Sequence, residues 1–177
     1  GRGGPRPAAP PASAPLSHPP PRPAGDLDHD DRLDVVAADF APAGSVSVLL
    51  NQLPGPWFDL GAGLAGSFGV PQLVGHGCCV AGQPASLTLT SAKPSSLAII
   101  FLSFASTPAP FKGGTLVPFP YAFMLQLFTN GSASIPLAFN WPGVFPPTFS
   151  IYFQYAIADA GGPAGAALSN CVKAVQP

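Results

Sequence analysis

Residues 149–158 read Phe-Ser-Ile-Tyr-Phe-Gln-Tyr-Ala-Ile-Ala, with a large apolar side chain at every second position from Phe149 to Ile157. Ser150, Tyr152 and Gln154 lie between them. Successive side chains of a β-strand point to opposite faces of the sheet, so this period of two predicts a strand with one face on a core. A strand needs neighbours for its backbone N–H and C=O groups. The segment therefore favours an all-β fold.

Further strand signals precede and follow it, separated by residues that favour turns. In the unit 53–177 the predicted strands are 72–76, 85–91, 96–104, 114–117, 121–129, 132–140, 148–158 and 166–175. Many short strands without helices, in a unit long enough to bury a core, predict an antiparallel β-sandwich. Within it, Asn130-Gly131 between two apolar runs predicts a two-residue β-hairpin.

The composition agrees with this fold class. The chain has 25 Pro and 20 Gly among 177 residues, and long helices are disfavoured because Pro breaks them and Gly weakens them. Its net charge is −1 and no basic cluster occurs, which excludes a nucleic-acid-binding surface. The longest apolar runs, 97–102 and 116–128, are too short for a transmembrane helix, so we expect no membrane span.

The first part of the chain has a different character. Residues 1–25 hold nine Pro and almost no large apolar side chains, which predicts a disordered arm. Residues 34–38 and 45–50 then predict a β-hairpin joined across 41–44, within a small unit covering 26–52. Residues 51–56, with Pro54-Gly55-Pro56, predict a linker to the larger unit.

An acidic cluster precedes this hairpin. Residues 26–34 read Asp-Leu-Asp-His-Asp-Asp-Arg-Leu-Asp, and two carboxylates about 4 Å apart repel by about 4 kcal/mol at an effective dielectric of about 20. A hard cation relieves that repulsion, and Ca²⁺ takes six to eight oxygen ligands. Loop positions 1, 3, 5 and 9 are Asp26, Asp28, Asp30 and Asp34, with the carbonyl of Arg32 at position 7. We therefore predict a calcium site there; a solvated acidic turn is the alternative.

The loop is not an EF-hand, because position 12 is Ala37 and not Glu. The acidic cluster and the later stretch Gly-Ser-Val-Ser-Val-Leu-Leu-Asn at 44–51 together resemble an FG-GAP/VCBS-type repeat. The resemblance covers residues 25–52. Such repeats build the calcium-binding β-propellers of integrin alpha chains and of many secreted bacterial proteins. The family usually has Gly at loop position 6, where this chain has Asp31, one of the few other residues that tolerate a positive φ.

That resemblance implies bound Ca²⁺, a propeller-type hairpin and an extracellular or cell-surface location. Because a single repeat cannot close a propeller, we expect the chain to be the C-terminal piece of a longer propeller-repeat protein.

The larger unit also resembles a known kind of domain, the β-rich C-terminal modules of large secreted bacterial proteins, which have no established activity. The resemblance rests on scattered positions: Trp57, Asp59-Leu60-Gly61, Leu64-Ala65-Gly66, Gly69-Val70-Pro71, Leu73-Val74-Gly75, Gln154, Asp159, Gly162-Pro163, Gly165, Leu168-Ser169-Asn170 and Pro177.

Signals for enzymatic chemistry are weak. Residues 61–66 spell G-x-G-x-x-G, but no helix pattern follows and no acid lies about 20 residues on, so we reject a dinucleotide site. The larger unit has two carboxylates, Asp59 and Asp159, and no G-x-S-x-G motif. We interpret His76 as a strand-end residue and Asp159 as a turn-former after the long strand. We expect that the chain is not an enzyme.

The three cysteines leave two interpretations open. Cys171 pairs with Cys78 or Cys79 in a disulfide, or all three are thiols in the core. A zinc site built from His76 and the Cys78-Cys79 pair is less favoured, because these residues form a crowded local set.

Together these patterns predict a non-catalytic, extracellular or cell-surface calcium-binding module with a structural or adhesive role, whose partners are surface proteins or glycans. The alternative is a carbohydrate-binding module appended to a secreted enzyme, with an aromatic platform drawn from Trp57, Trp141, Tyr121 and Tyr152. Core packing is the other interpretation of these aromatic side chains. A coplanar exposed pair of rings would favour sugar binding.

Overall fold

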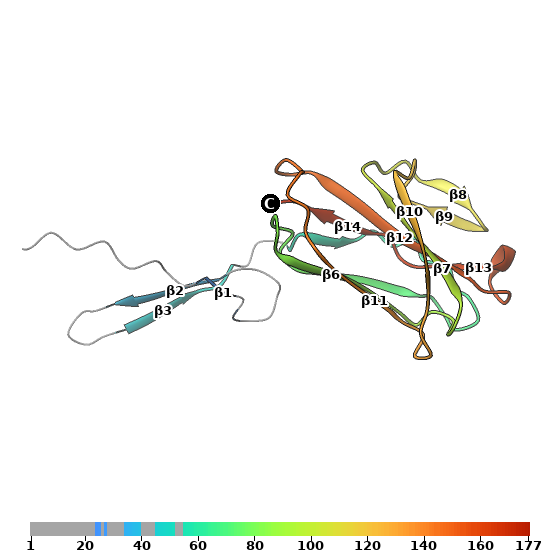
Figure 1. Ribbon diagram of the computed structural model, residues 1–177, viewed down its shortest axis with the longest axis horizontal. Helices are drawn as coiled ribbons and strands as arrows, with labels where there is room; N and C mark the ends of the chain where they lie inside the picture. Colours follow the sequence, from blue (N-terminus) through green and yellow to red (C-terminus); the bar gives the residue numbers. More distant parts are fainter. Residues whose placement is uncertain (1–23, 26, 28–33, 40–44, 52–54) are drawn as a thin grey trace, which may run out of the picture.

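The computed structural model describes residues 24, 25, 27, 34–39, 45–51 and 55–177. These residues form β-strands joined by turns, with one short 3-10 turn, Pro163–Gly165, as their helical element. All the strand pairs are antiparallel. The all-β class predicted from the sequence is confirmed (Figure 1).

The largest sheet is centred on the alternating segment 149–158. Its strand order is β10 (Phe123–Phe128), β7 (Leu97–Ser103), β12 (Ser150–Ala158), β14 (Val172–Val175) and β4 (Trp57–Asp59), and β13 (Ala166–Leu168) also pairs with β12. The long strand β12 therefore has partners along both of its edges, with Tyr155 opposite Ile100 of β7 and Phe153 opposite Val172 of β14.

A second sheet lies across the core from the first. Its strand order is β11 (Ile135–Asn140), β6 (Pro84–Thr90) and β5 (Gln72–His76). Buried side chains of both sheets, such as Leu87 and Leu89 from β6 and Ile100 from β7, belong to one apolar cluster. A separate two-stranded hairpin is formed by β8 (Ala109–Phe111) and β9 (Gly114–Leu116). We call residues 57–177 the two-sheet body.

From Phe153 to Ile157, the strand β12 is buried on both of its faces. Ile151, Phe153, Tyr155 and Ile157 lie in the core between the sheets. On the opposite face, Ala156 packs in a second cluster with Phe101, Leu116 and Leu168, and Gln154 is fully buried. The alternating pattern thus identified the core face, while the other face is covered as well.

The predicted hairpin at Asn130-Gly131 is wrong. β10 pairs with β7 and β11 pairs with β6, so the two segments on either side of the turn belong to different sheets. A type I′ turn needs a positive φ at both central residues. Here neither Asn130 nor Gly131 has one, and the positive φ lies at Ala133 (61°). The chain crosses from one sheet to the other at this point.

Most other predicted strands agree with the structure to within a few residues. The segment 166–175 is divided into β13 and β14, because Ser169, Asn170 and Cys171 leave the sheet between them. The strands β4 and β8 were not predicted; each is three residues long.

The N-terminal part contains a small sheet of β1 (Ala24–Gly25), β2 (Asp34–Asp39) and β3 (Ser45–Leu49). Both predicted hairpin strands are present, each within one residue of its predicted end. Ala24 and Gly25, which we assigned to the disordered arm, instead pair with Val35 and Asp34. Residues 1–23 of the predicted arm lie outside the described residues, as do 52–54 of the predicted linker.

In the part of the chain that the structure describes, no helix is long and apolar enough to cross a membrane.

Candidate functional site

Of the five predicted calcium ligands, the structure describes one. Asp34 begins β2 and is fully buried. Its Oδ2 accepts a hydrogen bond from the N–H of Leu27 at 2.8 Å, and its Oδ1 accepts one from the N–H of Asn51 at 2.8 Å. One carboxylate thus links the start of the acidic cluster, just after β1, to the segment after β3. Asp26, Asp28, Asp30 and Arg32 lie outside the described residues.

The chemistry of Asp34 is compatible with a calcium ligand. A carboxylate offers about four lone-pair positions, and the two N–H donors use two of them. The predicted donor set consists of oxygen atoms, which Ca²⁺ prefers. Among the described residues no three His, Cys, Asp or Glu side chains lie close enough together to hold a metal.

The second buried carboxylate, Asp159, joins two loops of the two-sheet body. Its Oδ2 accepts a hydrogen bond from the N–H of Ser67 at 2.6 Å, and its Oδ1 accepts one from the Ser67 hydroxyl at 2.6 Å. The N–H of Gly161 also donates to Oδ1 at 3.0 Å, and the Lys93 ammonium lies 3.9 Å away. The hydrogen bond from the Ser67 hydroxyl is the largest of the effects that lower the pKa of Asp159. The turn-forming role predicted for Asp159 agrees with the bond from Gly161, and Ser67 adds a contact across 92 residues.

The buried amide of Gln154 has a similar structural role. Its Oε1 accepts a hydrogen bond from the N–H of Val117 at 2.9 Å, and its Nε2 donates to the carbonyls of Thr115 and Ser169 at 3.1 and 3.0 Å. Asn170 makes a pair of bonds with the backbone of Leu73, one to its N–H and one to its carbonyl, at 2.7 and 3.0 Å. Several residues that carried the resemblance to secreted C-terminal modules therefore connect the strands to loops that do not pair with them.

The G-x-G-x-x-G stretch has no helix after it. Leu64 forms an isolated bridge with Leu168, and Gly66 forms one with Gly69. A β-carbon on Gly63 would meet Val70, and one on Gly66 would meet Asp159 and Ala167. These glycines allow the loop to lie against β13 and the Asp159 turn.

The cysteines form no disulfide with one another. Cys79 and Cys171 are fully buried, and burial raises the pKa of Cys171 to about 12. The structure therefore shows no disulfide among them, and the interpretation as core thiols holds for Cys79 and Cys171 but not for Cys78, which is half-buried.

The two tryptophans do not form a surface platform for sugar. Trp141 is only 1% exposed, and Trp57 packs against the core with its ring centroid 5.9 Å from that of Trp141 in an edge-to-face arrangement. Tyr121 is exposed but contacts Phe101 edge-to-face, and Tyr152 is half-buried. The interpretation of the tryptophans as core residues is confirmed, and the aromatic platform loses its two largest rings.

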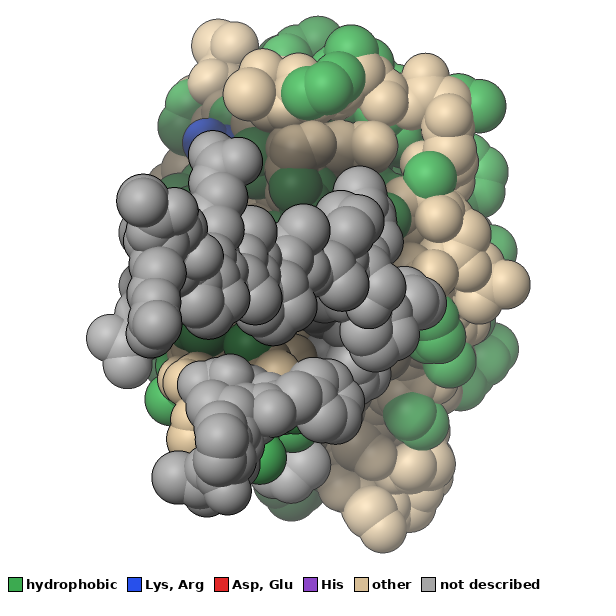
Figure 2. Space-filling view, turned by 90° about the vertical axis from the view of Figure 1, so that its left-hand side faces the viewer, with side chains coloured by type: hydrophobic (Ala, Val, Ile, Leu, Met, Phe, Trp, Pro, Cys, Tyr) green, Lys and Arg blue, Asp and Glu red, His purple; other side chains and the backbone are tan. Residues whose placement is uncertain are grey.

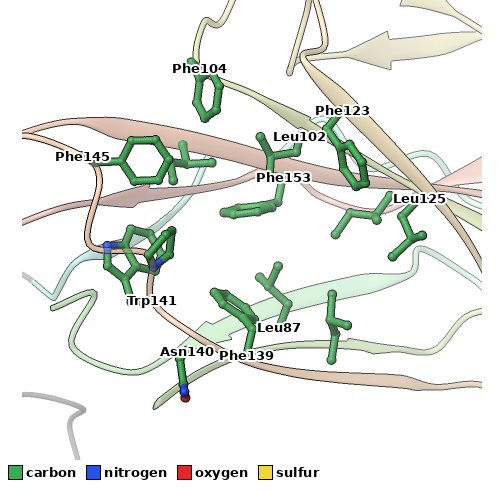
Figure 3. Close-up of a pocket in the computed structure, with 14 residues that line it drawn as sticks. Leu87, Leu102, Phe104, Phe123, Leu125, Phe139, Asn140, Trp141, Phe145 and Phe153 are labelled. Atoms are coloured by element: carbon green, nitrogen blue, oxygen red, sulfur yellow. The ribbon is translucent and has the colours of Figure 1, made fainter. Parts of the chain in front are cut away.

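An apolar pocket of about 320 Å³ opens between the two sheets. It lies where β7 and β10 face β6 and β11, and the loop after β11 closes one end of it. Its floor consists of buried core residues, Leu87, Ile100, Trp141, Ile151 and Phe153. Its rim includes exposed side chains, Phe104, Phe123 and Leu125 (Figure 3).

Charged groups are scarce on this part of the molecule. Residues 55–177 contain five of them: Asp59, Lys93, Lys112, Asp159 and Lys173. None lines the pocket. Where described atoms are visible in Figure 2, the surface consists mainly of apolar side chains and uncharged polar groups.

The sequence patterns did not predict this pocket. Its lining comes from five strands and from the loops after β7 and β11, so no contiguous motif marks it. The available signal is in 123–128, Phe-Met-Leu-Gln-Leu-Phe, where apolar residues occupy both faces of a strand.

Comparison with protein-family models, with curated proteins and with solved structures gave no match to the chain.

Proposed function

We propose that the chain is a non-catalytic, extracellular or cell-surface module in which a calcium-binding, propeller-type hairpin precedes a β-sandwich. Its role is structural or adhesive. The proposal rests on the acidic loop of residues 26–34 and on its resemblance to FG-GAP/VCBS-type repeats.

The proposed calcium binding is supported best by the position of Asp34 in the small sheet. Its buried carboxylate holds the backbone N–H groups of Leu27 and Asn51, one from each side of the small sheet. Hydrogen bonds to a charged group contribute about 1.5–3 kcal/mol each. A ligand fixed in this way at the end of the loop needs less ordering when an ion binds, which favours binding.

The non-catalytic part is supported by how the polar side chains of the two-sheet body are used. Asp159, Gln154 and Asn170 are buried and bonded to backbone groups or to Ser67. A general acid or base has to reach a substrate proton. These groups instead hold loops against strands, which is a structural role.

Calorimetric titration with CaCl₂ tests this function on the whole chain. We expect a dissociation constant of about 10⁻⁴–10⁻³ M, as for extracellular calcium modules. Asp28→Ala and Asp30→Ala should abolish binding, because each removes a ligand. Asp31→Gly should tighten it, because Gly relaxes the turn at loop position 6.

Asp59→Ala is the matched control. It removes the same charge from an exposed position, where the carboxylate accepts a hydrogen bond from the nearby N–H of Gly61, so calcium binding should be unchanged. If Asp28→Ala and Asp30→Ala bind calcium as well as the wild type, the cluster is a solvated acidic turn and the proposed function fails.

A further inference from the structure

The pocket between the sheets combines a buried floor with an exposed apolar rim. Leu87 and Phe153 at the floor are 1% and 5% exposed, whereas Phe123 and Leu125 at the rim are 56% and 40% exposed. A sealed packing defect would be buried on all sides. This gradient describes a pocket that a molecule can enter from solvent.

The rim belongs to β10, an edge strand of the larger sheet. Five of its six residues are exposed, and five of the six are apolar. Exposed apolar side chains that gather at one place on a surface mark binding sites more often than scattered ones do. Here the exposed apolar side chains of β10 adjoin the pocket, so the exposed apolar surface and the pocket form one site.

The lining determines which chemistry fits. Its fourteen residues include one polar side chain, Asn140, and the amide of Asn140 points away from the apolar side chains in Figure 3. No charged residue lines the pocket. An ionised ligand would lose its hydration without gaining a partner, which is costly. The occupant is therefore neutral.

The rings around the pocket narrow the class further. Aromatic side chains come from both sheets and from the loops after β7 and β11: Phe104, Phe123, Phe139, Trp141, Phe145 and Phe153. Aromatic pairs gain from offset-stacked and edge-to-face contacts beyond the area that they bury. The volume, about 320 Å³, is roughly twice that of an apolar protein cavity known to bind benzene.

From these observations we propose that the pocket is a binding site for a neutral, hydrophobic small molecule that contains aromatic rings and has about the size of two of them. The site is separate from the calcium loop and does not depend on the proposed function. No bond is made or broken in it.

The test uses two fluorescent probes with the same ring system. N-phenylnaphthylamine is neutral, and anilinonaphthalenesulfonate carries one additional sulfonate. On the whole chain we expect saturable binding of the neutral probe with a stoichiometry of one. The sulfonate should bind at least about tenfold more weakly, because no cation lines the pocket.

Two variants of β10 locate the site. Leu125 lines the pocket, while Met124 is its neighbour in sequence, is 50% exposed and does not line it. Leu125→Trp should fill the cavity and weaken binding of the neutral probe at least about tenfold, whereas Met124→Trp should change it less than about twofold. Both positions are exposed, so both variants should keep the urea midpoint of the wild type.

Equal affinities in the two variants, or tighter binding of the sulfonate, would overturn the proposal. The proposal would also be overturned if the wild-type protein were a dimer that does not bind the probe and Leu125→Glu converted it to monomers. The rim would then be an interface between two copies. Probe titrations in calcium and in a chelator separate this proposal from the proposed calcium site. The affinity for the neutral probe should be the same in both solutions, whether or not calorimetry detects calcium binding to the acidic loop.

Discussion

Gly75 lies against the indole ring of Trp57, and a β-carbon at Gly75 would overlap with the ring atoms Cε3, Cδ2 and Cζ3. The indole N–H of Trp57 donates to the carbonyl of Gly77 at 2.8 Å, so the ring is held from β4 onto β5. This contact joins the edge strands of the two sheets on the side away from the pocket.

Gly75→Ala should therefore destabilise the two-sheet body. The ring has to move or the strands have to separate, and overpacking of this kind costs about 1–3 kcal/mol. Gly131→Ala is the control, because nothing lies within 4 Å of a β-carbon there, and we expect a change of less than about 0.5 kcal/mol. Urea unfolding followed by tryptophan fluorescence measures both. Equal midpoints would show that the indole is not held in this position.

Tyr155→Phe should leave the protein as stable or make it more stable. The ring of Tyr155 is fully buried in the core, and its hydroxyl has no hydrogen-bond partner among the described residues. A buried unsatisfied polar group costs about 1–3 kcal/mol, so removing it should raise the free energy of unfolding by about 1 kcal/mol.

Alkaline unfolding gives a second measure of the same hydroxyl. Burial raises the pKa of Tyr155 from 10.0 to about 12, so the neutral phenol stabilises the fold up to about pH 10 and this stability is lost as the pH rises through 12. Tyr155→Phe should lose that part of the pH dependence. If instead the variant is less stable by 1 kcal/mol or more, the hydroxyl has a partner.

Asp159→Asn should alter the response to acid. The pKa of Asp159 is lowered below 3.8, chiefly by the hydrogen bond from the Ser67 hydroxyl. A lowered pKa in the folded state means that the stabilisation is present above the ordinary value and is lost as the pH falls through the folded value. The variant should be less stable at neutral pH by about 1–2 kcal/mol, and its stability should change less between neutral pH and pH 2.

Ser67→Ala should move the acid transition of the wild type upward, because it removes the hydroxyl donor but keeps the N–H donor. If both variants show the same dependence of stability on pH as the wild type, Asp159 does not contribute to stability in acid.

The strand positions followed from the sequence because alternation is a local property. Phe149 to Ile157 alternate strictly, and β12 begins and ends within two residues of the predicted bounds. The same local signal did not reveal that Gln154 would be buried, because its cover comes from distant segments: the loop that contains Ala62, strand β9 at Thr115, and Val117 just after β9.

Strand pairing was harder to predict because it depends on distant partners. Leu125 and Ile135 are separated by a sequence typical of a tight hairpin, yet Leu125 pairs with Ile100 and Ile135 with Leu89. The pocket arises from this crossing, since β10 and β11 diverge into the two sheets on either side of it. No short-range pattern encodes such a gap.

The predicted calcium loop differs from the pocket, because it was inferred from a local sequence pattern. Its predicted ligands were assigned from their spacing, and Asp34 is the one among them whose side chain is described, with its oxygens accepting hydrogen bonds from the N–H groups of Leu27 and Asn51. Those two amides are reporters next to the predicted site.

An amide-resolved NMR titration of the whole chain with CaCl₂ tests the central claim most directly. We predict saturable shifts for the amides of residues 26–34 and of Asn51, with one dissociation constant of about 10⁻⁴–10⁻³ M and with no shift at Gly131 or Leu127 of the two-sheet body. At about 1 mM calcium such a site adds only about 0.4–1.4 kcal/mol to the stability of the small sheet. If the amides of Leu27 and Asn51 do not move at about 10 mM calcium, ten times the weakest constant expected, residues 26–34 form no calcium site and the proposed function is wrong.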